Sequence, residues 1–351
     1  MNAATWPRED PLAERLLVVD PEAGTFRDAA IGDLPARLRP GDLLVVNDAA
    51  TLPASLTGCT VDGAAVEVRL AARHGDTWTC VLFGAGDWRT RTEDRPLATP
   101  LLPGDHIDFD GTLSARVRGV HSSRTVELDF EPRGDAFVAA LYRLGRPVQY
   151  AYLERPLPLW AVQTSYAGRP WAVEMPSAGR PLTWSLLSVM RGRGIEFARL
   201  THAAGLSSTG DAWLDARLPL PERSDVPEAT AHAVDATHAR GGRVIAVGTS
   251  VVRALEGRVA SRGELTPGED ETDLILGPGY PLRVVDGLLT GMHEQTASHY
   301  ALLGAFAPAA LLREAYIHAE RAGYMQHEFG DSSLIANGAL AGGAHVTRRT
   351  S

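Results

Sequence analysis

The sequence contains no lysine, so the 34 basic residues among its 351 are all arginine. Without lysine, the chain cannot form a Schiff base with a carbonyl substrate or build a Walker-type phosphate loop. The 43 acidic residues leave a net charge of -9, which argues against a histone-like grip on nucleic acid. A local arginine patch remains compatible with this balance. The densest basic cluster, around Arg191 and Arg193, would either contact phosphates or form a solvated helix end.

Cysteine and long apolar runs are also scarce. Cys59 and Cys80 do not form a Cys-x-x-Cys pair, which argues against a disulfide scaffold and against a cysteine-based zinc site. The histidines lack the i, i+4 spacing of metal ligands on one helix face. No apolar run approaches the roughly 20 residues of a membrane span, and the first ten residues contain no apolar signal-peptide core. We therefore expect a metal-free, cytoplasmic protein.

The pattern of apolar runs and turns predicts two kinds of structure. Arg15 to Asp20 and Leu43 to Val46 are short apolar runs bounded by turn residues, which is typical of buried strands. From about Gly58 to Gln149, short strand candidates alternate with turns, as in a small β-barrel. The later part alternates strands and helices. The prediction is an α/β protein with an inserted all-β, barrel-like domain: residues 1–58 with 150–351 form the α/β main domain, and residues 59–149 form the insert.

The predicted elements of the second half follow from apolar periodicity and capping residues. Amphipathic spacing predicts helices, and short β-branched runs predict strands. The expected helices cover 181–199, 226–240, 249–257 and 309–323, and the expected strands cover 195–200, 243–248, 273–276 and 283–286.

One strand–turn–helix unit has a possible ligand role. The apolar run Arg243 to Gly248 leads directly into Thr249 and Ser250, which are suited to begin a helix. Gly248 permits a tight turn, and the free N–H groups of a helix N-terminus attract an anion or carboxylate. The alternative is an ordinary capped helix, because such units are common.

Three further positions combine acid or imidazole groups with strand ends. Asp286 and His293 would lie in loops near strand ends and could exchange protons, or they are a turn residue and a surface histidine. His202 directly follows an expected strand, where it is either a base or an edge histidine. Asp331 follows a glycine and would bind a ribose hydroxyl or cap a helix.

Several of these segments, in their order along the chain, resemble the S-adenosylmethionine:tRNA ribosyltransferase-isomerase family of the queuosine pathway. The resemblance covers nearly the whole chain. It is carried by the segments Pro40 to Asp48 (PGDLLVVND), Val244 to Glu256 (VIAVGTSVVRALE), Pro278 to His293 (PGYPLRVVDGLLTGMH) and Phe329 to Ile335 (FGDSSLI).

The resemblance implies an α/β domain with an inserted β-barrel and a defined reaction. The ribosyl part of S-adenosylmethionine would be transferred to 7-aminomethyl-7-deazaguanine in the tRNA wobble position and isomerised. Epoxyqueuosine would form, and adenine and methionine would leave. The implied partners are S-adenosylmethionine, as co-substrate, and the anticodon loop of tRNA. No metal, membrane or obligate protein partner is implied.

The same resemblance suggests roles for individual residues. A sulfonium acidifies the neighbouring ribose carbon, so a general base must stand close to it. We expect His202 or His293 to transfer protons and Asp286 to orient them. The residues expected to hold S-adenosylmethionine are Gly248, Thr249, Ser250 and Arg253, with Thr249 and its helix N-terminus at the methionine carboxylate, and Asp331 at the ribose hydroxyls.

Departures from the family pattern leave two other functions open. A histidine of the family is replaced by Pro181, and an arginine of the family is replaced by Ser55. One alternative is a diverged enzyme that uses S-adenosylmethionine with a non-tRNA acceptor. The other is a non-catalytic RNA-binding paralogue.

Overall fold

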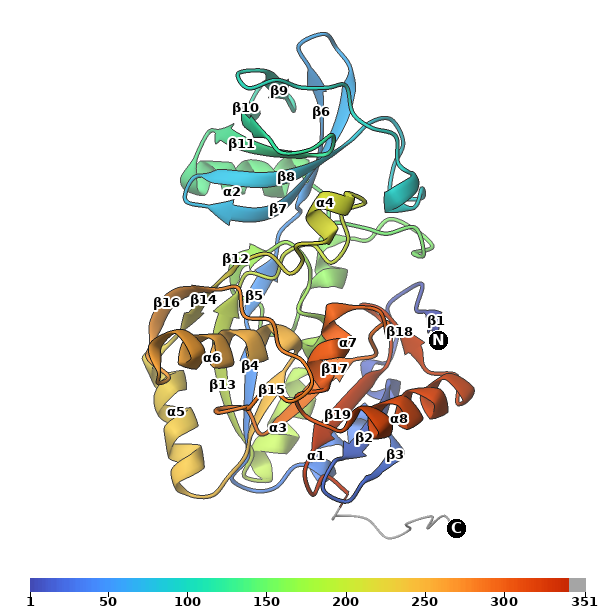
Figure 1. Cartoon of the computed structure of the whole chain (residues 1–351), viewed down its shortest axis with the longest axis vertical. Coiled ribbons are helices and arrows are strands. Elements are labelled where there is room, and N and C mark those ends of the chain that lie inside the picture. The colour runs from blue at the N-terminus through green and yellow to red at the C-terminus, as the bar shows by residue number, and fades with distance from the viewer. Residues whose placement is uncertain (341–351) are drawn as a thin grey trace.

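The computed structural model describes residues 1–340, which form a β-barrel set on a larger α/β body (Figure 1). Within this part of the chain, six strands close into the barrel in the order β10-β11-β8-β7-β6-β9. Alternating small and apolar side chains fill its interior, so it is a packed core rather than a pore. Its strands are β6 (Ser55–Thr60), β7 (Ala65–His74), β8 (Thr77–Phe83), β9 (His106–Asp108), β10 (Ser114–Val120) and β11 (Thr125–Glu131).

The α/β body is built on one mixed sheet of nine strands within the described residues. Its centre is parallel, which explains why the central strands read as continuous apolar runs. In spatial order the strands are β16 (Gly268–Thr272), β14 (Glu222–Val226), β13 (Glu196–His202), β4 (Leu43–Asn47), β15 (Val244–Val247), β17 (Gly287–Gly291), β19 (Ser332–Ala336), β2 (Arg15–Asp20) and β3 (Thr25–Ala30).

Helices cover both faces of this sheet. Alternate residues of the central strands point to opposite faces, so Leu43 and Val45 join one apolar core while Leu44 and Val46 join the other. The first core includes side chains of α5 (Glu228–Ala239), α6 (Thr249–Arg262), α7 (Ser298–Leu303) and α8 (Ala309–Arg321). The second includes α1 (Leu34–Arg37) and α3 (Trp184–Gly192).

Short elements connect the barrel to the body. β5 (Ala49–Thr51) leaves the sheet after β4 and pairs in parallel with β12 (Arg169–Ala172) just before the barrel begins. α2 (Gly134–Leu144) packs against the barrel core through Phe137. α4 (Ala212–Asp215) lies between the two parts in Figure 1. The division at residues 58/59 and 149/150 remains our proposal for the domain boundaries.

Two early strands of the chain pair with two late ones. β19 runs parallel to β2, and β1 (Asn2–Ala3) pairs in parallel with β18 (Met325–Gln326). The N-terminal strands β2 and β3 therefore form one edge of the sheet, next to the late strand β19.

The predicted α/β class with an all-β barrel is confirmed, but some elements differ. The helix expected over 181–199 ends at Gly192, because Gly194 turns the chain with φ +79° into β13. Residues 283–286 form no strand, since the Glu256 carboxylate accepts the backbone N–H groups of Arg283, Val284 and Val285. Strand β16 precedes the run expected over 273–276.

None of the helices in residues 1–340 combines the length and apolarity that a membrane crossing requires.

Candidate functional site

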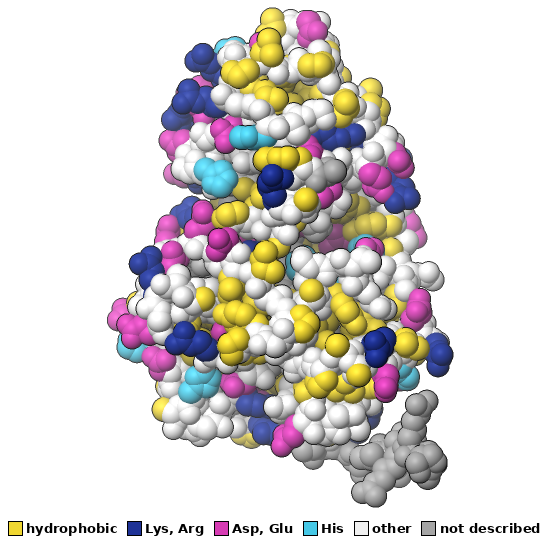
Figure 2. Space-filling view, viewed as in Figure 1, with side chains coloured by type: hydrophobic (Ala, Val, Ile, Leu, Met, Phe, Trp, Pro, Cys, Tyr) yellow, Lys and Arg dark blue, Asp and Glu magenta, His cyan; other side chains and the backbone are white. Residues whose placement is uncertain are grey.

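A cleft of about 1210 Å³ opens between the barrel and the carboxyl ends of the central parallel strands. Figure 2 shows the surface hollowed at this level, with acidic and histidine side chains inside the hollow. In open α/β sheets, ligands bind beyond the carboxyl ends of the strands. Gly248, Gly291 and Ala204 line the cleft directly after or at the ends of three of these strands. The sheet topology thus places the candidate site here.

The N-terminus of α6 forms one wall of the cleft. Gly248 holds φ +93° and carries no side chain to cap the helix. Thr249 and Ser250 line the cleft, and within the described residues their backbone N–H groups have no hydrogen-bond acceptor. Asn47 donates from Nδ2 to Ser250 Oγ over 3.3 Å and so ties the helix start to β4. The predicted anion-binding helix start therefore faces a cavity large enough for a ligand.

His293 lies on the same wall, after β17. Its Nε2 is 2.8 Å from Thr290 Oγ1, and its ring stacks on His299 with centroids 5.2 Å apart. Burial, together with the neighbouring His299 and His327, lowers the pKa of His293 to about 3. The imidazole is therefore neutral near pH 7, with Nδ1 as the ring nitrogen left for a ligand.

Glu174 is a functional candidate that the sequence patterns did not reveal. It lines the cleft after β12, where it accepts hydrogen bonds from the Tyr150 hydroxyl and from Ser207 N, the latter at 3.2 Å. Burial and the nearby Glu328 raise the pKa of Glu174 to about 7, above its ordinary value of 4.5. A carboxyl group with this pKa is poised to take up or release a proton at neutral pH. The only local signal was an acid within the apolar segment Ala172 to Met175.

An aromatic and acidic cluster lines the cleft next to His293. Tyr152 stacks between Tyr150, with centroids 6.0 Å apart, and His327, with centroids 4.3 Å apart. The Tyr152 hydroxyl donates to Glu328, and His327 Nε2 lies 3.4 Å from Glu294 Oε1. His327 adopts φ +72°, an uncommon conformation for a residue other than glycine. Such residues cluster at functional sites.

The cleft carries more carboxylates than cationic side chains. Acidic side chains line the cleft both from the barrel, as Glu93 does, and from the sheet, as Glu222 does. The acidic lining residues are Glu93, Glu174, Asp215, Glu222, Glu294 and Glu328, and the arginines are Arg91 and Arg253. An excess of carboxylates favours a cationic ligand.

His202 does not line the cleft, so its role as a proton-transfer group remains a prediction to which the structure adds no support. Its side chain is fully buried at the end of β13, and burial lowers its pKa to about 4. Nε2 is 3.4 Å from Glu222 Oε2 but is not aligned for a hydrogen bond, and among the described residues neither ring nitrogen has a hydrogen-bond partner. Its neighbour Glu222 does line the cleft.

Arg253 lines the cleft but its guanidinium is already engaged. It forms an ion pair with Glu222, and Nε donates to Leu274 O over 3.1 Å. With 5 % of its surface exposed, Arg253 is better placed to hold Glu222 and α6 together than to bind a ligand anion directly. Its assignment as a ligand-binding residue remains a prediction.

Asp286 and His293 lie at opposite ends of the same strand, so they do not form the expected acid–imidazole pair. It precedes β17, whereas His293 follows it. The Asp286 carboxylate pairs with His238 Nε2 at 3.0 Å and accepts the N–H of Val244 over 2.8 Å. The side chain therefore anchors the start of β15.

We expect Asp286→Ala to leave turnover within a few-fold of the parent. The buried Val244 N–H would lose its acceptor, so the free energy of unfolding should fall by about 1–2 kcal/mol. Urea denaturation and a steady-state assay would measure the two effects, and a loss of turnover above tenfold without destabilisation would contradict the structural role.

Asp331 is buried beneath the cleft rather than exposed in it. Its carboxylate accepts hydrogen bonds from Arg8 Nη2 at 2.5 Å, from Arg15 N at 3.0 Å and from Met325 N at 2.8 Å. These donors occupy both carboxylate oxygens, so the expected contact with ribose hydroxyls does not fit the geometry. Asp331 instead fixes the N-terminal segment to the start of β19.

Two expectations concern sites for other ligands. Among residues 1–340, no three His, Cys, Asp or Glu side chains are grouped as metal ligands would be. The cluster around Arg191 and Arg193 lies at the C-terminal end of α3, near Gly41. It is therefore at the amino ends of the parallel strands, away from the cleft. It cannot contribute phosphate contacts at this site.

The chain is similar to known proteins along almost all of its length. A family model described as queuosine biosynthesis protein matches residues 2–335. The S-adenosylmethionine:tRNA ribosyltransferase-isomerase of Gloeobacter violaceus is 38% identical, over 96% of this chain and 93% of the relative. That of Rhodospirillum rubrum is 35% identical, over 92% of this chain and 91% of the relative.

A solved structure extends the likeness to the fold. The crystal structure of an S-adenosylmethionine tRNA ribosyltransferase from Thermotoga maritima superposes with a TM-score of 0.53 at 26% identity, covering 95% of each chain. On the near full-length match to the family model and these relatives, the chain belongs to the S-adenosylmethionine:tRNA ribosyltransferase-isomerase family of queuosine biosynthesis proteins.

Proposed function

We propose that this protein transfers the ribosyl part of S-adenosylmethionine to 7-aminomethyl-7-deazaguanine in the tRNA wobble position and isomerises it. Epoxyqueuosine forms, and adenine and methionine are released. The observation that carries the proposal is the acidic cleft between the barrel and the α6 N-terminus, in a chain of this family. With tRNA as the acceptor, the protein would work in the cytoplasm.

The cleft suits S-adenosylmethionine because it offers complementary charge to both ends of the methionine part. The unpaired N–H groups at Thr249 and Ser250 would receive the carboxylate, as helix N-termini do for anions. The surrounding carboxylates, including Glu294 and Glu328, would favour the sulfonium and the ammonium. When bound, S-adenosylmethionine supplies the ribosyl group and the acidified ribose carbon.

Glu174 is the residue we assign to remove the proton from that carbon. With its pKa raised to about 7, Glu174 is a stronger base than His293, whose pKa is lowered to about 3. A proton acceptor works best when its pKa lies near the operating pH. Tyr150 and Ser207 hold the carboxylate in place by hydrogen bonds.

His293 then takes a different role from that of base. As a neutral imidazole held by Thr290, it can offer a hydrogen bond from its free ring nitrogen to the departing adenine. This assignment divides the proton transfers between two different side chains of the cleft.

The decisive test is to incubate the protein with S-adenosylmethionine and an anticodon stem-loop that carries the deazaguanine base. Adenine release and RNA mass are followed together, with the RNA omitted as a control. Adenine release accompanied by a heavier RNA is the expected result. Adenine release without RNA dependence would favour a non-tRNA acceptor, and RNA binding without S-adenosylmethionine binding would favour a non-catalytic paralogue.

A further inference from the structure

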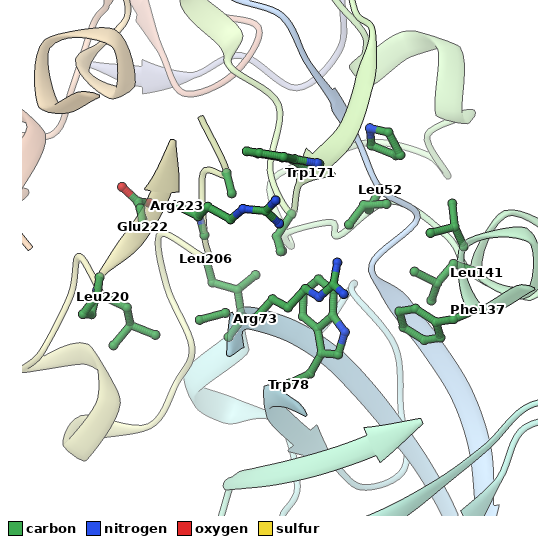
Figure 3. A pocket seen from close by; sticks show the side chains of 18 of the residues that line it. Leu52, Arg73, Trp78, Phe137, Leu141, Trp171, Leu206, Leu220, Glu222 and Arg223 are labelled. Atoms are coloured by element: carbon green, nitrogen blue, oxygen red, sulfur yellow. Dashed lines mark hydrogen bonds between the residues drawn. The ribbon is translucent and has the colours of Figure 1, made fainter. Parts of the chain in front are cut away.

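A second cavity, of about 420 Å³, lies at the junction of the barrel and the α/β body (Figure 3). Its floor is apolar, and its charged lining residues are Arg73, Arg223, Asp135 and Glu222. Leu52, Phe137, Leu141, Leu206 and Leu220 line it together with two tryptophans, Trp78 and Trp171. The reaction proposed above uses none of these side chains.

The barrel half of this cavity pairs an arginine with a tryptophan. Arg73 on β7 and Trp78 on β8 are direct cross-strand partners, and Figure 3 shows them side by side at the cavity. Trp78 packs on Phe137 of α2 with centroids 6.0 Å apart, so its ring is held in position. Arg73 is 44% exposed and lies 3.6 Å from Asp76, an exposed pair that another anion can replace at little cost.

The body half repeats the same combination. Trp171 on β12 faces the cavity, and the Arg223 guanidinium lies 3.8 Å from its ring centroid. Figure 3 shows Arg223 directly beneath Trp171 and pointing toward the cavity. Arg223 also pairs with the exposed Glu269 at 2.8 Å. An arginine and a tryptophan from the barrel therefore face the stacked Arg223 and Trp171 of the body across the cavity.

The cavity and the large cleft are neighbours and share part of their lining. Gly205, Leu206, Leu218 and Glu222 line both spaces. Glu222 is already neutralised by its ion pair with Arg253, so it does not oppose an anion in the smaller cavity. A strand that places one nucleotide in the cleft would have its neighbour within reach of this cavity.

We propose that this junction cavity binds one unpaired nucleotide of the RNA substrate, adjacent to the nucleotide that reacts in the cleft. The base stacks between the Trp78 ring and the Arg223 guanidinium that lies on Trp171, and Arg73 takes a flanking phosphate. Proteins recognise unpaired bases by stacking on aromatic rings and guanidinium planes, and arginines at the rim supply the charge that an apolar small molecule would not need. The inference rests on the proposed function, because it takes RNA as the substrate.

The test measures the affinity of the full-length protein for a fluorescein-labelled anticodon stem-loop by anisotropy, over a series of salt concentrations. Trp171→Ala should weaken binding about tenfold with an unchanged salt slope, because stacking is lost but no phosphate contact is. Trp171→Phe, which keeps a ring, should remain within about threefold. Arg73→Ala should weaken binding and lower the salt slope by roughly 0.7–0.9, the value of one phosphate contact.

Matched controls remove the same side-chain types elsewhere on the surface. Trp184 is exposed at the start of α3, and Arg193 lies at the end of α3, near the amino ends of the strands. Trp184→Ala and Arg193→Ala should both bind RNA like the parent. S-adenosylmethionine binding, measured by calorimetry, should be unchanged in every variant and shows that each has folded.

The outcomes separate this inference from the proposed function. If the parent binds the RNA but Trp171→Ala binds it as tightly as Trp184→Ala does, the cavity proposal is overturned and the reaction stands. If the parent binds no RNA, the proposed function fails and the cavity proposal fails with it. A loss in Trp171→Ala that Trp171→Phe does not restore would assign the residue a structural role only.

Discussion

Glu174→Gln is expected to lower kcat by about a hundredfold or more while KM for S-adenosylmethionine changes little. Glutamine still accepts the hydrogen bonds of Tyr150 and Ser207, so the cleft keeps its shape. It cannot take up a proton, and positioned proton transfer contributes roughly 10²–10⁴-fold. Steady-state kinetics of adenine release in the presence of RNA would measure the loss.

The pH profile provides a second readout of the same residue. Glu174 must be ionised to accept a proton, and burial raises its pKa to about 7. In the parent, kcat/KM should therefore rise with pH up to about 7 and then level off. In Glu174→Gln this limb should disappear from the residual activity.

A matched control is Glu93→Gln, which removes an exposed carboxylate from the barrel side of the same cleft. Its kcat should stay within about threefold of the parent, and the limb near pH 7 should remain. Equal losses in the two variants would mean that Glu174 acts only through the overall charge of the cleft, and that another group removes the proton.

Thr249→Asp is expected to raise KM for S-adenosylmethionine at least about tenfold with little change in kcat. The new carboxylate would stand at the α6 N-terminus, where the methionine carboxylate is proposed to bind, and the two would repel one another. The same substitution should keep or slightly increase the melting temperature, because an acid in the first turn of a helix interacts favourably with the helix dipole.

These opposite effects on binding and stability make the test specific. Thr249→Ala removes the hydroxyl without adding charge and should stay within a few-fold of the parent in KM. If Thr249→Asp binds S-adenosylmethionine as tightly as Thr249→Ala does, the carboxylate does not lie at this helix start.

The parts of the fold that could be predicted from sequence are those fixed by neighbours along the chain. The run Arg243 to Glu256 encodes a strand, a glycine turn and a helix locally, and the structure has β15, Gly248 and α6 in that order. The barrel was predictable for the same reason, since each of its hairpins joins consecutive short strands.

Elements that depend on distant partners were not predictable. Residues 283–286 have the composition of a strand, yet Glu256 of α6 accepts the backbone N–H groups of Arg283, Val284 and Val285. The pair of Asp286 and His293 failed for a geometric reason. The five residues of β17 and Met292 separate them, and the extended strand alone spans roughly 16 Å.

Glu174 shows the same limit within the site. In the sequence, Glu174 is only an acidic residue within a short apolar run. Its raised pKa arises from burial and from Glu328, which lies far away in the sequence. Only the folded chain brings these groups together, so the most basic group proposed for the reaction had no local signature.

The pairing of β2 with β19 has a consequence for how the protein is made. All six barrel strands lie within residues 55–131 and can pair as soon as that segment leaves the ribosome. β2 emerges far earlier than β19, its neighbour in the sheet, which begins only at Ser332. We therefore expect the insert to fold during synthesis. Strand β2 should stay unpaired with β19, and accessible to chaperones, until translation is almost finished.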